Sequence, residues 1–63
     1  MKYRPLESDE AQSGMTVRFT DREDRFLVTI TEVLAHDKFW AQFPDGHEYL
    51  VRLKQLEFVS TDY

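Results

Sequence analysis

The chain has 63 residues and no cysteine, so we expect one small domain without disulfides or thiolate-bound zinc, in the reducing cytoplasm. Twelve acidic residues against eight basic ones give a net charge of −4, which opposes general binding to nucleic acids and to anionic membranes. Hydrophobic residues make up 41% of the sequence, enough for a folded core, but no apolar run is long enough for a membrane span or a signal peptide.

The N-terminal third of the sequence contains one clear strand. Residues 1–13 have no hydrophobic period, which predicts a flexible N-terminal arm with one helical turn after Ser8. Residues 15–20 alternate apolar and polar side chains, the pattern of a half-buried strand. Residues 21–25 are all charged, which predicts an exposed loop.

The remaining sequence predicts four more strands. Proline followed by aspartate and glycine at Pro44-Asp45-Gly46 is typical of a three-residue hairpin loop. Leu53 and Leu56 have the spacing of a single 3₁₀ turn. The predicted strands are residues 26–34, 39–43, 47–53 and 57–59, with a polar connection at 35–38 and a short tail at 60–63.

The loop lengths also predict the register of the strands. A three-residue loop at 44–46 places Trp40 opposite Leu50 and Ala41 opposite Tyr49. A four-residue loop at 35–38 places Val33 opposite Trp40 and Glu32 opposite Ala41, on the interior face. Because a lone buried carboxylate is costly, we expect a β-bulge or a sharp bend at Glu32.

Three segments resemble the SH3-like small barrel, the architecture of SH3 and Tudor domains. They are Gly14-Met15-Thr16-Val17-Arg18, Phe43-Pro44-Asp45-Gly46 and Leu50-Val51-Arg52-Leu53-Lys54-Gln55-Leu56-Glu57. The first and last are also similar to the small SH3-like subunits of photosynthetic electron-transport complexes, in which G-x-x-V-R and R-L-x-x-L-E recur. The resemblance implies an all-β, five-stranded barrel over residues 14–59. The proline-binding tyrosines of peptide-binding SH3 domains are absent from the sequence.

Catalytic and metal-binding chemistry has little support in the sequence. The residue types that suit a metal ion occur at His36, Asp37, His47 and Glu48. The two histidines flank opposite ends of one predicted strand, about 16 Å apart, too far to share an ion. The serines lie in the predicted arm and tail, away from any histidine and carboxylate. We therefore expect no enzyme activity, no metal site and no cofactor.

The strongest functional signal is an apolar row on the outer face of three predicted strands. Val33, Trp40 and Leu50 are expected side by side where a free-standing domain would carry polar residues. Buried aromatic side chains ringed by polar ones dominate protein-binding energy. We therefore predict a partner-binding surface formed by Val33, Trp40, Gln42, Glu48, Leu50 and Arg52, with Thr31 also on its rim.

The partner is expected to be another protein with a basic or neutral surface, which makes the domain an adaptor, a small complex subunit or an inhibitor. Alternatively, residues 1–13 fold back over the row, or two copies pair through it; the sequence does not decide between monomer and homodimer. A further alternative is an RNA- or DNA-associated barrel that uses Arg18, Arg52 and Lys54.

The resemblance to Tudor domains implies one more alternative, a reader of methylated peptides. Its aromatic cage would use Phe26, Phe39 and Tyr49, the latter two around an open pocket. The predicted register instead directs all three side chains into the interior, where a barrel of this size needs them as core.

Overall fold

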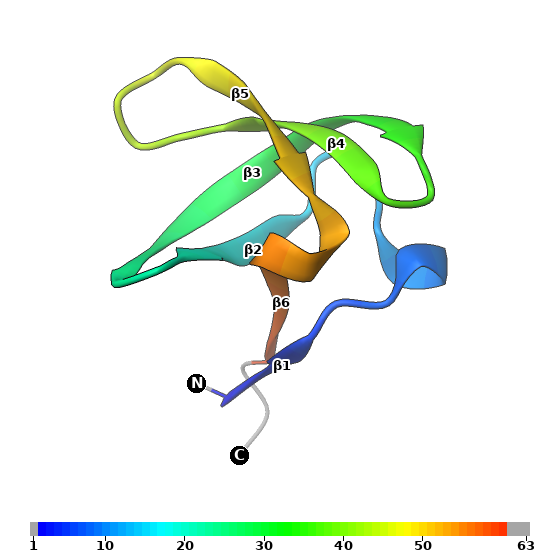
Figure 1. Cartoon of the computed structure of the whole chain (residues 1–63). Helices are drawn as coiled ribbons and strands as arrows, with labels where there is room; N and C mark the ends of the chain where they lie inside the picture. The colour runs from blue at the N-terminus through cyan, green and yellow to red at the C-terminus, as the bar shows by residue number, and fades with distance from the viewer. Residues whose placement is uncertain (1, 61–63) are drawn as a thin grey trace.

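The computed structural model describes residues 2–60, which form an all-β protein with a single antiparallel sheet. The strands are β1 (Lys2–Pro5), β2 (Thr16–Asp21), β3 (Asp24–Ala35), β4 (Lys38–Gln42), β5 (Glu48–Arg52) and β6 (Leu56–Ser60). Two 3₁₀ turns, η1 (Ser8–Glu10) and η2 (Leu53–Gln55), lie between them. The strands follow the order β1-β6-β2-β3-β4-β5 across the sheet, so β1 and β5 are its two edges (Figure 1).

The predicted strands and both predicted helical turns are present, and two connections are shorter than expected. Asp21 pairs with Asp24, and Ala35 pairs with Lys38, so each hairpin turns within two residues. The backbone continues its pairing past these charged side chains because they point into solvent. Apart from Ser60 at the end of β6, the predicted tail lies outside the described residues.

The β4–β5 hairpin confirms the predicted turn and register. Trp40 pairs with Leu50 and Ala41 with Tyr49. The Phe43 N–H donates to the His47 carbonyl at 2.8 Å, and the Gly46 N–H donates to the Phe43 carbonyl at 2.9 Å. Gly46 has a φ of 89°, the left-handed conformation that this loop requires and that glycine adopts most easily.

The β3–β4 register is correct at the turn and wrong further along. Irregularities between Val33 and Ala35 and between Ile30 and Glu32 each shift the pairing by one residue. As a result Glu32, rather than Val33, lies opposite Trp40, and Ile30 lies opposite Ala41. The second irregularity confirms the bulge expected at Glu32; it places apolar Ile30 in the interior and leaves the carboxylate exposed.

The structure corrects the predicted flexible N-terminal arm and the predicted five-stranded barrel, because the described strands form one six-stranded sheet that is not closed. Lys2–Pro5 pairs with β6 as a sixth strand, and Leu6 is only 4% exposed in the core. The charged side chains of this segment had suggested that it is exposed to solvent. Two of these charges are instead paired, because the Arg4 guanidinium lies 2.8 Å from the Glu10 carboxylate. Because β1 forms the edge opposite to β5, residues 2–6 do not cover the predicted row.

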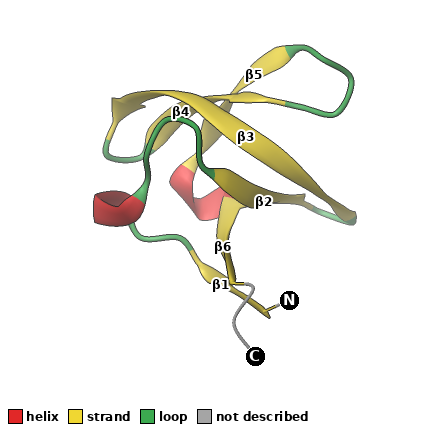
Figure 2. Ribbon diagram, turned by 180° about the vertical axis from the view of Figure 1, so that it is seen from behind, coloured by secondary structure: helices red, strands yellow, loops and turns green. Residues whose placement is uncertain are grey.

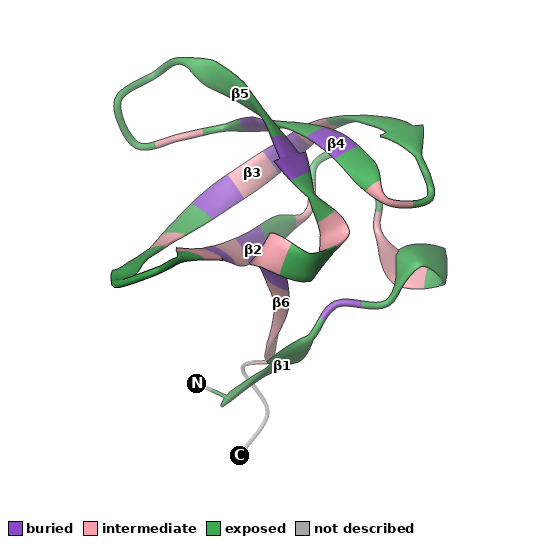
Figure 3. Cartoon of the chain, in the orientation of Figure 1, coloured by how far each residue is buried: buried purple, intermediate pink, exposed green. Residues whose placement is uncertain are grey.

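The core fills the inner face of the bent sheet. It consists of Leu6, Val17, Phe19, Val28, Ile30, Phe39, Ala41, Val51 and Leu56. Figure 3 places the buried positions near the middle of the strands and leaves the hairpin ends exposed. From behind, the segment after η1 passes beside β3 (Figure 2), where the Ile30 N–H donates to the Met15 carbonyl at 2.9 Å.

Within residues 2–60, no helix is long and apolar enough to cross a membrane.

Candidate functional site

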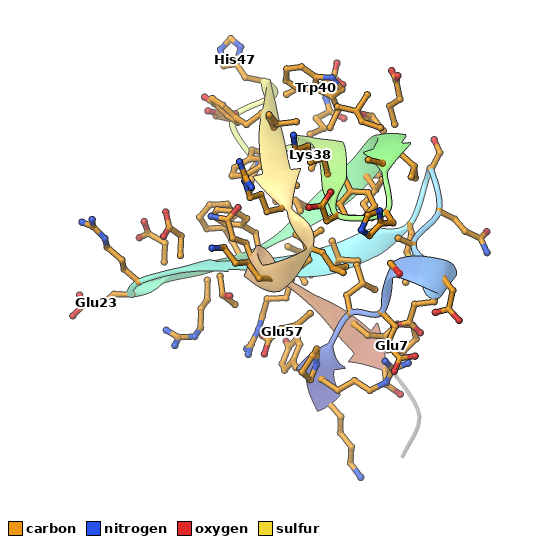
Figure 4. The ribbon with its side chains drawn as sticks, turned by 45° about the vertical axis from the view of Figure 1, so that its right-hand side comes forward. Glu7, Glu23, Lys38, Trp40, His47 and Glu57 are labelled. Atoms are coloured by element: carbon orange, nitrogen blue, oxygen red, sulfur yellow. The ribbon has the colours of Figure 1, made fainter. Side chains whose placement is uncertain are left out.

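The structure brings together most of the predicted outward row. Trp40 and Leu50 are a cross-strand pair and are 37% and 51% exposed. Figure 4 places the Trp40 indole on the outer side of the sheet near β5. Val33 is also exposed, but the irregularity between Val33 and Ala35 displaces it from the position beside Trp40, which Glu32 takes. The row therefore consists of an apolar pair with a carboxylate beside the tryptophan.

Of the predicted rim residues, Gln42, Glu48 and Arg52 are exposed around this pair, and Thr31 is half-buried. Gln42 pairs with Glu48 at one end of the β4–β5 hairpin, and Arg52 lies at the other end, opposite Lys38. The Thr31 hydroxyl is within hydrogen-bond distance of both the Glu48 carboxylate and the Trp40 carbonyl. Glu32, Trp40 and Glu48 together line a shallow hollow of about 290 Å³.

A second candidate site lies between the ends of the β2–β3 and β4–β5 hairpins. This site, called the aromatic groove below, has a volume of about 420 Å³. It is lined by Phe19, Asp21, Asp24, Phe26, Phe43, Asp45, Tyr49, Leu50, Val51 and Gln55. It therefore combines four aromatic rings with three carboxylates, and none of its described lining residues is lysine or arginine.

The four rings of the groove form one connected cluster. The centroids of Phe19 and Phe43 are 4.9 Å apart, and Phe26 contacts both rings at 5.5 and 5.3 Å. Tyr49 extends the cluster, with its centroid 4.8 Å from that of Phe43 in an edge-to-face arrangement. Such contacts fix ring orientation, so the groove presents a preorganised aromatic surface.

The local sequence explains why these rings gather at one end of the sheet. Phe19 and Phe26 are a cross-strand pair two residues from the Asp21–Asp24 hairpin end. Phe43 directly precedes the Pro44-Asp45-Gly46 turn and bonds to His47, whereas Tyr49 pairs with Ala41, so Phe43 and Tyr49 are diagonal neighbours across the strands. Diagonal neighbours of this kind lie within reach of aromatic side chains, so each hairpin contributes two rings beside acidic turn residues.

Asp45 is held in its charged form by its own hairpin. Its carboxylate accepts hydrogen bonds from the His47 backbone N–H at 2.9 Å and the Tyr49 hydroxyl at 2.8 Å. The His47 bond, followed by the Tyr49 bond, lowers the pKa of Asp45 below its ordinary value. The same contact raises the pKa of Tyr49, because its hydroxyl donates to a carboxylate.

The predicted interior positions of the cage residues are correct only in part. Phe39 is fully buried in the core, as the register predicted. Tyr49 was expected inside but is 44% exposed, and Phe26 is half-buried. The prediction holds in part for Phe26, which packs against the core, and was wrong for Tyr49. Both residues line the groove at the open hairpin ends.

Sequence reasoning missed several groove residues, namely Phe19, Phe43, Asp21, Asp24 and Asp45. The available signal was their repeated arrangement, an aromatic residue on each side of an acidic turn in both hairpins.

The other candidate residues form no comparable cluster. In the described part of the chain, no group of three histidine or acidic side chains is placed to hold a metal ion. Arg18 is held by the Glu57 carboxylate, 2.6 Å from its Nη2 atom, and its guanidinium lies 3.6 Å from the centroid of Tyr3. Arg52 and Lys54 lie together at the β5–η2 junction, where they line a hollow with Asp37 and Leu53.

Comparisons of this chain with protein-family models, with curated proteins and with solved structures find no match.

Proposed function

We propose that this domain is a non-enzymatic module that binds another protein by accepting a positively charged side chain in the aromatic groove. The observation that carries the proposal is the composition of the groove: four clustered rings and three carboxylates, with no cationic side chain among its described lining residues. Cations bind over aromatic faces, and nearby carboxylates add long-range attraction. The net charge of −4 favours the same basic partner.

The chain itself uses the same chemistry elsewhere. The Arg4 guanidinium lies 4.2 Å from the Phe58 ring centroid and pairs with Glu10. Arg18 is held in the same way between Tyr3 and Glu57. In both cases one cation contacts one aromatic ring and one carboxylate. The groove supplies aromatic rings and carboxylates, so we infer that the ligand supplies the cation.

A methylated lysine is the form of cation that best fits the groove. Methylation keeps the positive charge but replaces N–H donors with methyl groups, which favours ring faces over hydrogen-bond acceptors. The order β6-β2-β3-β4-β5, with η2 between β5 and β6, supports the SH3-like arrangement that the sequence resembles, with β1 added outside it. The proposal is therefore a Tudor-like reader of methylated basic segments.

The experiment compares three small probes of nearly the same shape. We expect acetyl-trimethyllysine amide to shift the backbone amide NMR signals of Gly46 and Tyr49, acetyl-lysine amide to bind about tenfold more weakly, and the uncharged carbon analogue of trimethyllysine not to bind. Equal binding of the charged and uncharged analogues would show a merely apolar pocket. The absence of shifts with all three probes would overturn the proposal.

Matched variants locate the binding site. Phe26→Leu keeps an apolar side chain without a π face, and Asp24→Asn keeps the volume without the charge. Phe26→Leu is expected to weaken binding of the trimethyllysine probe about tenfold, since a cation–π contact contributes about 1 kcal/mol or more. Asp24→Asn is expected to weaken it as well, because the attraction of the carboxylate for the cation is lost. Trp40→Ala, outside the groove, is the control and should leave binding unchanged. A larger effect of Trp40→Ala would move the site to the outward row.

A further inference from the structure

Among the described residues, the outer side of the edge strand β5 has no partner strand, although Tyr49, Leu50 and Val51 of β5 line the groove. The Phe43 N–H bonds to the His47 carbonyl, so the hydrogen-bonded pairs of the β4–β5 hairpin fall at alternate positions. Tyr49 and Val51 therefore face β4 with their backbone groups, and Glu48, Leu50 and Arg52 direct theirs to the free edge. The Arg52 N–H confirms this phase, because it bonds to the Gln55 side-chain oxygen at 3.0 Å.

The charges of β5 would complement those of a second, antiparallel copy of the same strand. It reads Glu48-Tyr49-Leu50-Val51-Arg52, with an acid at one end, a base at the other and leucine between them. If two copies of this strand lie antiparallel about Leu50, each Glu48 lies opposite the other copy's Arg52. Directly opposite residues of antiparallel strands are close enough for ion pairing.

The neighbouring strand strengthens this complementarity. Arg52 lies opposite Lys38 within the chain, so two positive side chains are neighbours on the outer face. At the other end of β5, Glu48 shares a hollow with Glu32. The positive end of one copy would meet the negative end of the other, which relieves the like-charge contact in both.

We propose that two copies of this chain pair through the free edge of β5, with Leu50 at the two-fold axis. The two Leu50 residues exchange backbone hydrogen bonds, and the Trp40–Leu50 pair of each copy joins into one apolar stripe across both sheets. Leu50 is the most exposed of the large hydrophobic residues in the described chain, and this pairing would cover it. The proposal does not rest on the proposed ligand of the groove, although Leu50 also lines that groove.

The dimer is expected to dissociate on dilution, because the new ladder is short. The Arg52 N–H already has a partner in Gln55, which limits the added backbone bonds to the region of Leu50. Small interfaces of this kind are typical of weak association. Sedimentation analysis of the purified chain over a wide concentration range should show a shift from one-chain to two-chain mass, whereas one-chain mass throughout would overturn the proposal.

A charge-swap series tests the symmetry of the pairing. Glu48→Arg alone and Arg52→Glu alone each place like charges opposite one another at both ends of the interface, so each should abolish the dimer. The double variant Glu48→Arg/Arg52→Glu restores opposite charges and should recover dimerisation. Glu23→Arg is the control for net charge, because Glu23 lies at the tip of the β2–β3 turn (Figure 4).

The experiment distinguishes loss of dimerisation from loss of folding and from loss of ligand binding in the groove. Circular dichroism establishes that each variant is folded; if Glu48→Arg loses structure with its Thr31 contact, Arg52→Glu carries the test. A dimer that survives both single variants, or a double variant that stays monomeric, would contradict pairing through β5. Neither Glu48 nor Arg52 lines the aromatic groove, so their variants should still bind the trimethyllysine probe.

Discussion

The β1–β6 edge and the aromatic groove use the same three kinds of side chain, but only the edge contains all three. At the edge, Arg4 and Arg18 each contact an aromatic ring and a carboxylate from the same chain. In the groove, rings and carboxylates come together without a lining cation among the described residues. The contacts at the edge are complete within the described chain, whereas the groove would need a cation from a ligand, as proposed above, to form the same contacts.

The two regions also differ in how they are attached to the core. The edge is anchored by Leu6, which is buried among the other core residues directly after β1. The groove is formed at the open ends of two hairpins, where Tyr49 and Asp45 are exposed and depend on the turn for their positions. Changes at the edge should therefore act on global stability, whereas changes at the groove should act mainly on binding.

The largest expected effect comes from removing the anchor of the edge. Leu6→Ala should lower the free energy of unfolding by about 2–5 kcal/mol, because a buried leucine leaves a cavity. Urea denaturation followed by circular dichroism measures this loss. Leu50→Ala, the same change at an exposed position, should stay within about 0.5 kcal/mol of the wild type. Similar losses in the two variants would contradict the anchoring role of Leu6.

A smaller effect is expected from straining the turn that carries half of the groove. Gly46→Ala forces a side chain into a φ of 89°, which should cost about 1–2 kcal/mol. The space around Gly46 is open, so the cost reflects backbone conformation and not a clash. Gly46→Asn is the control and should lose less, because asparagine tolerates this region better. Equal thermal midpoints for wild type and Gly46→Ala would refute the argument.

Local signals in the sequence were sufficient for much of the fold. The alternation in β2 and β4, the Pro44-Asp45-Gly46 turn and the spacing of Leu53 and Leu56 predicted strands, hairpin and 3₁₀ turn where they occur. These features depend on the residues themselves and their immediate neighbours. The β4–β5 register followed because the length of a tight turn determines which residues pair.

Features that depend on distant residues were missed. β1 is stabilised by β6, more than fifty positions away in the sequence, and by the partners of Arg4 and Arg18. The irregularity between Val33 and Ala35, which was not expected, shifted Val33 away from Trp40, whereas the one between Ile30 and Glu32 lies where a bulge was expected. Tyr49 lies on the inner face of the sheet, as its register predicted. It is nevertheless exposed, because the two hairpin ends are apart there, and the sequence does not determine how far apart they lie.

The smallest expected effect is a common response of the two regions to acid. At the edge, the pKa of Glu10 is lowered by hydrogen bonds from the Arg4 side chain and, to a lesser extent, from the Glu7 backbone N–H. In the groove, the pKa of Asp45 is lowered by hydrogen bonds from the His47 backbone N–H and then from the Tyr49 hydroxyl. A carboxylate whose pKa is lower in the folded state contributes stability above its unfolded pKa and loses it as the pH falls through the folded value.

The thermal midpoint should therefore fall slightly as the pH drops through the acidic range where carboxylates titrate. Asp45 is exposed and Glu10 is half-buried near the surface, so solvent screening keeps each contribution small. Glu10→Gln and Asp45→Asn should each flatten part of this pH dependence and together flatten more. Only Asp45→Asn should also change binding of the trimethyllysine probe, since Asp45 lines the groove and Glu10 does not. If Glu10→Gln weakened that binding equally, the edge and the groove would be coupled and the separation between them would be wrong.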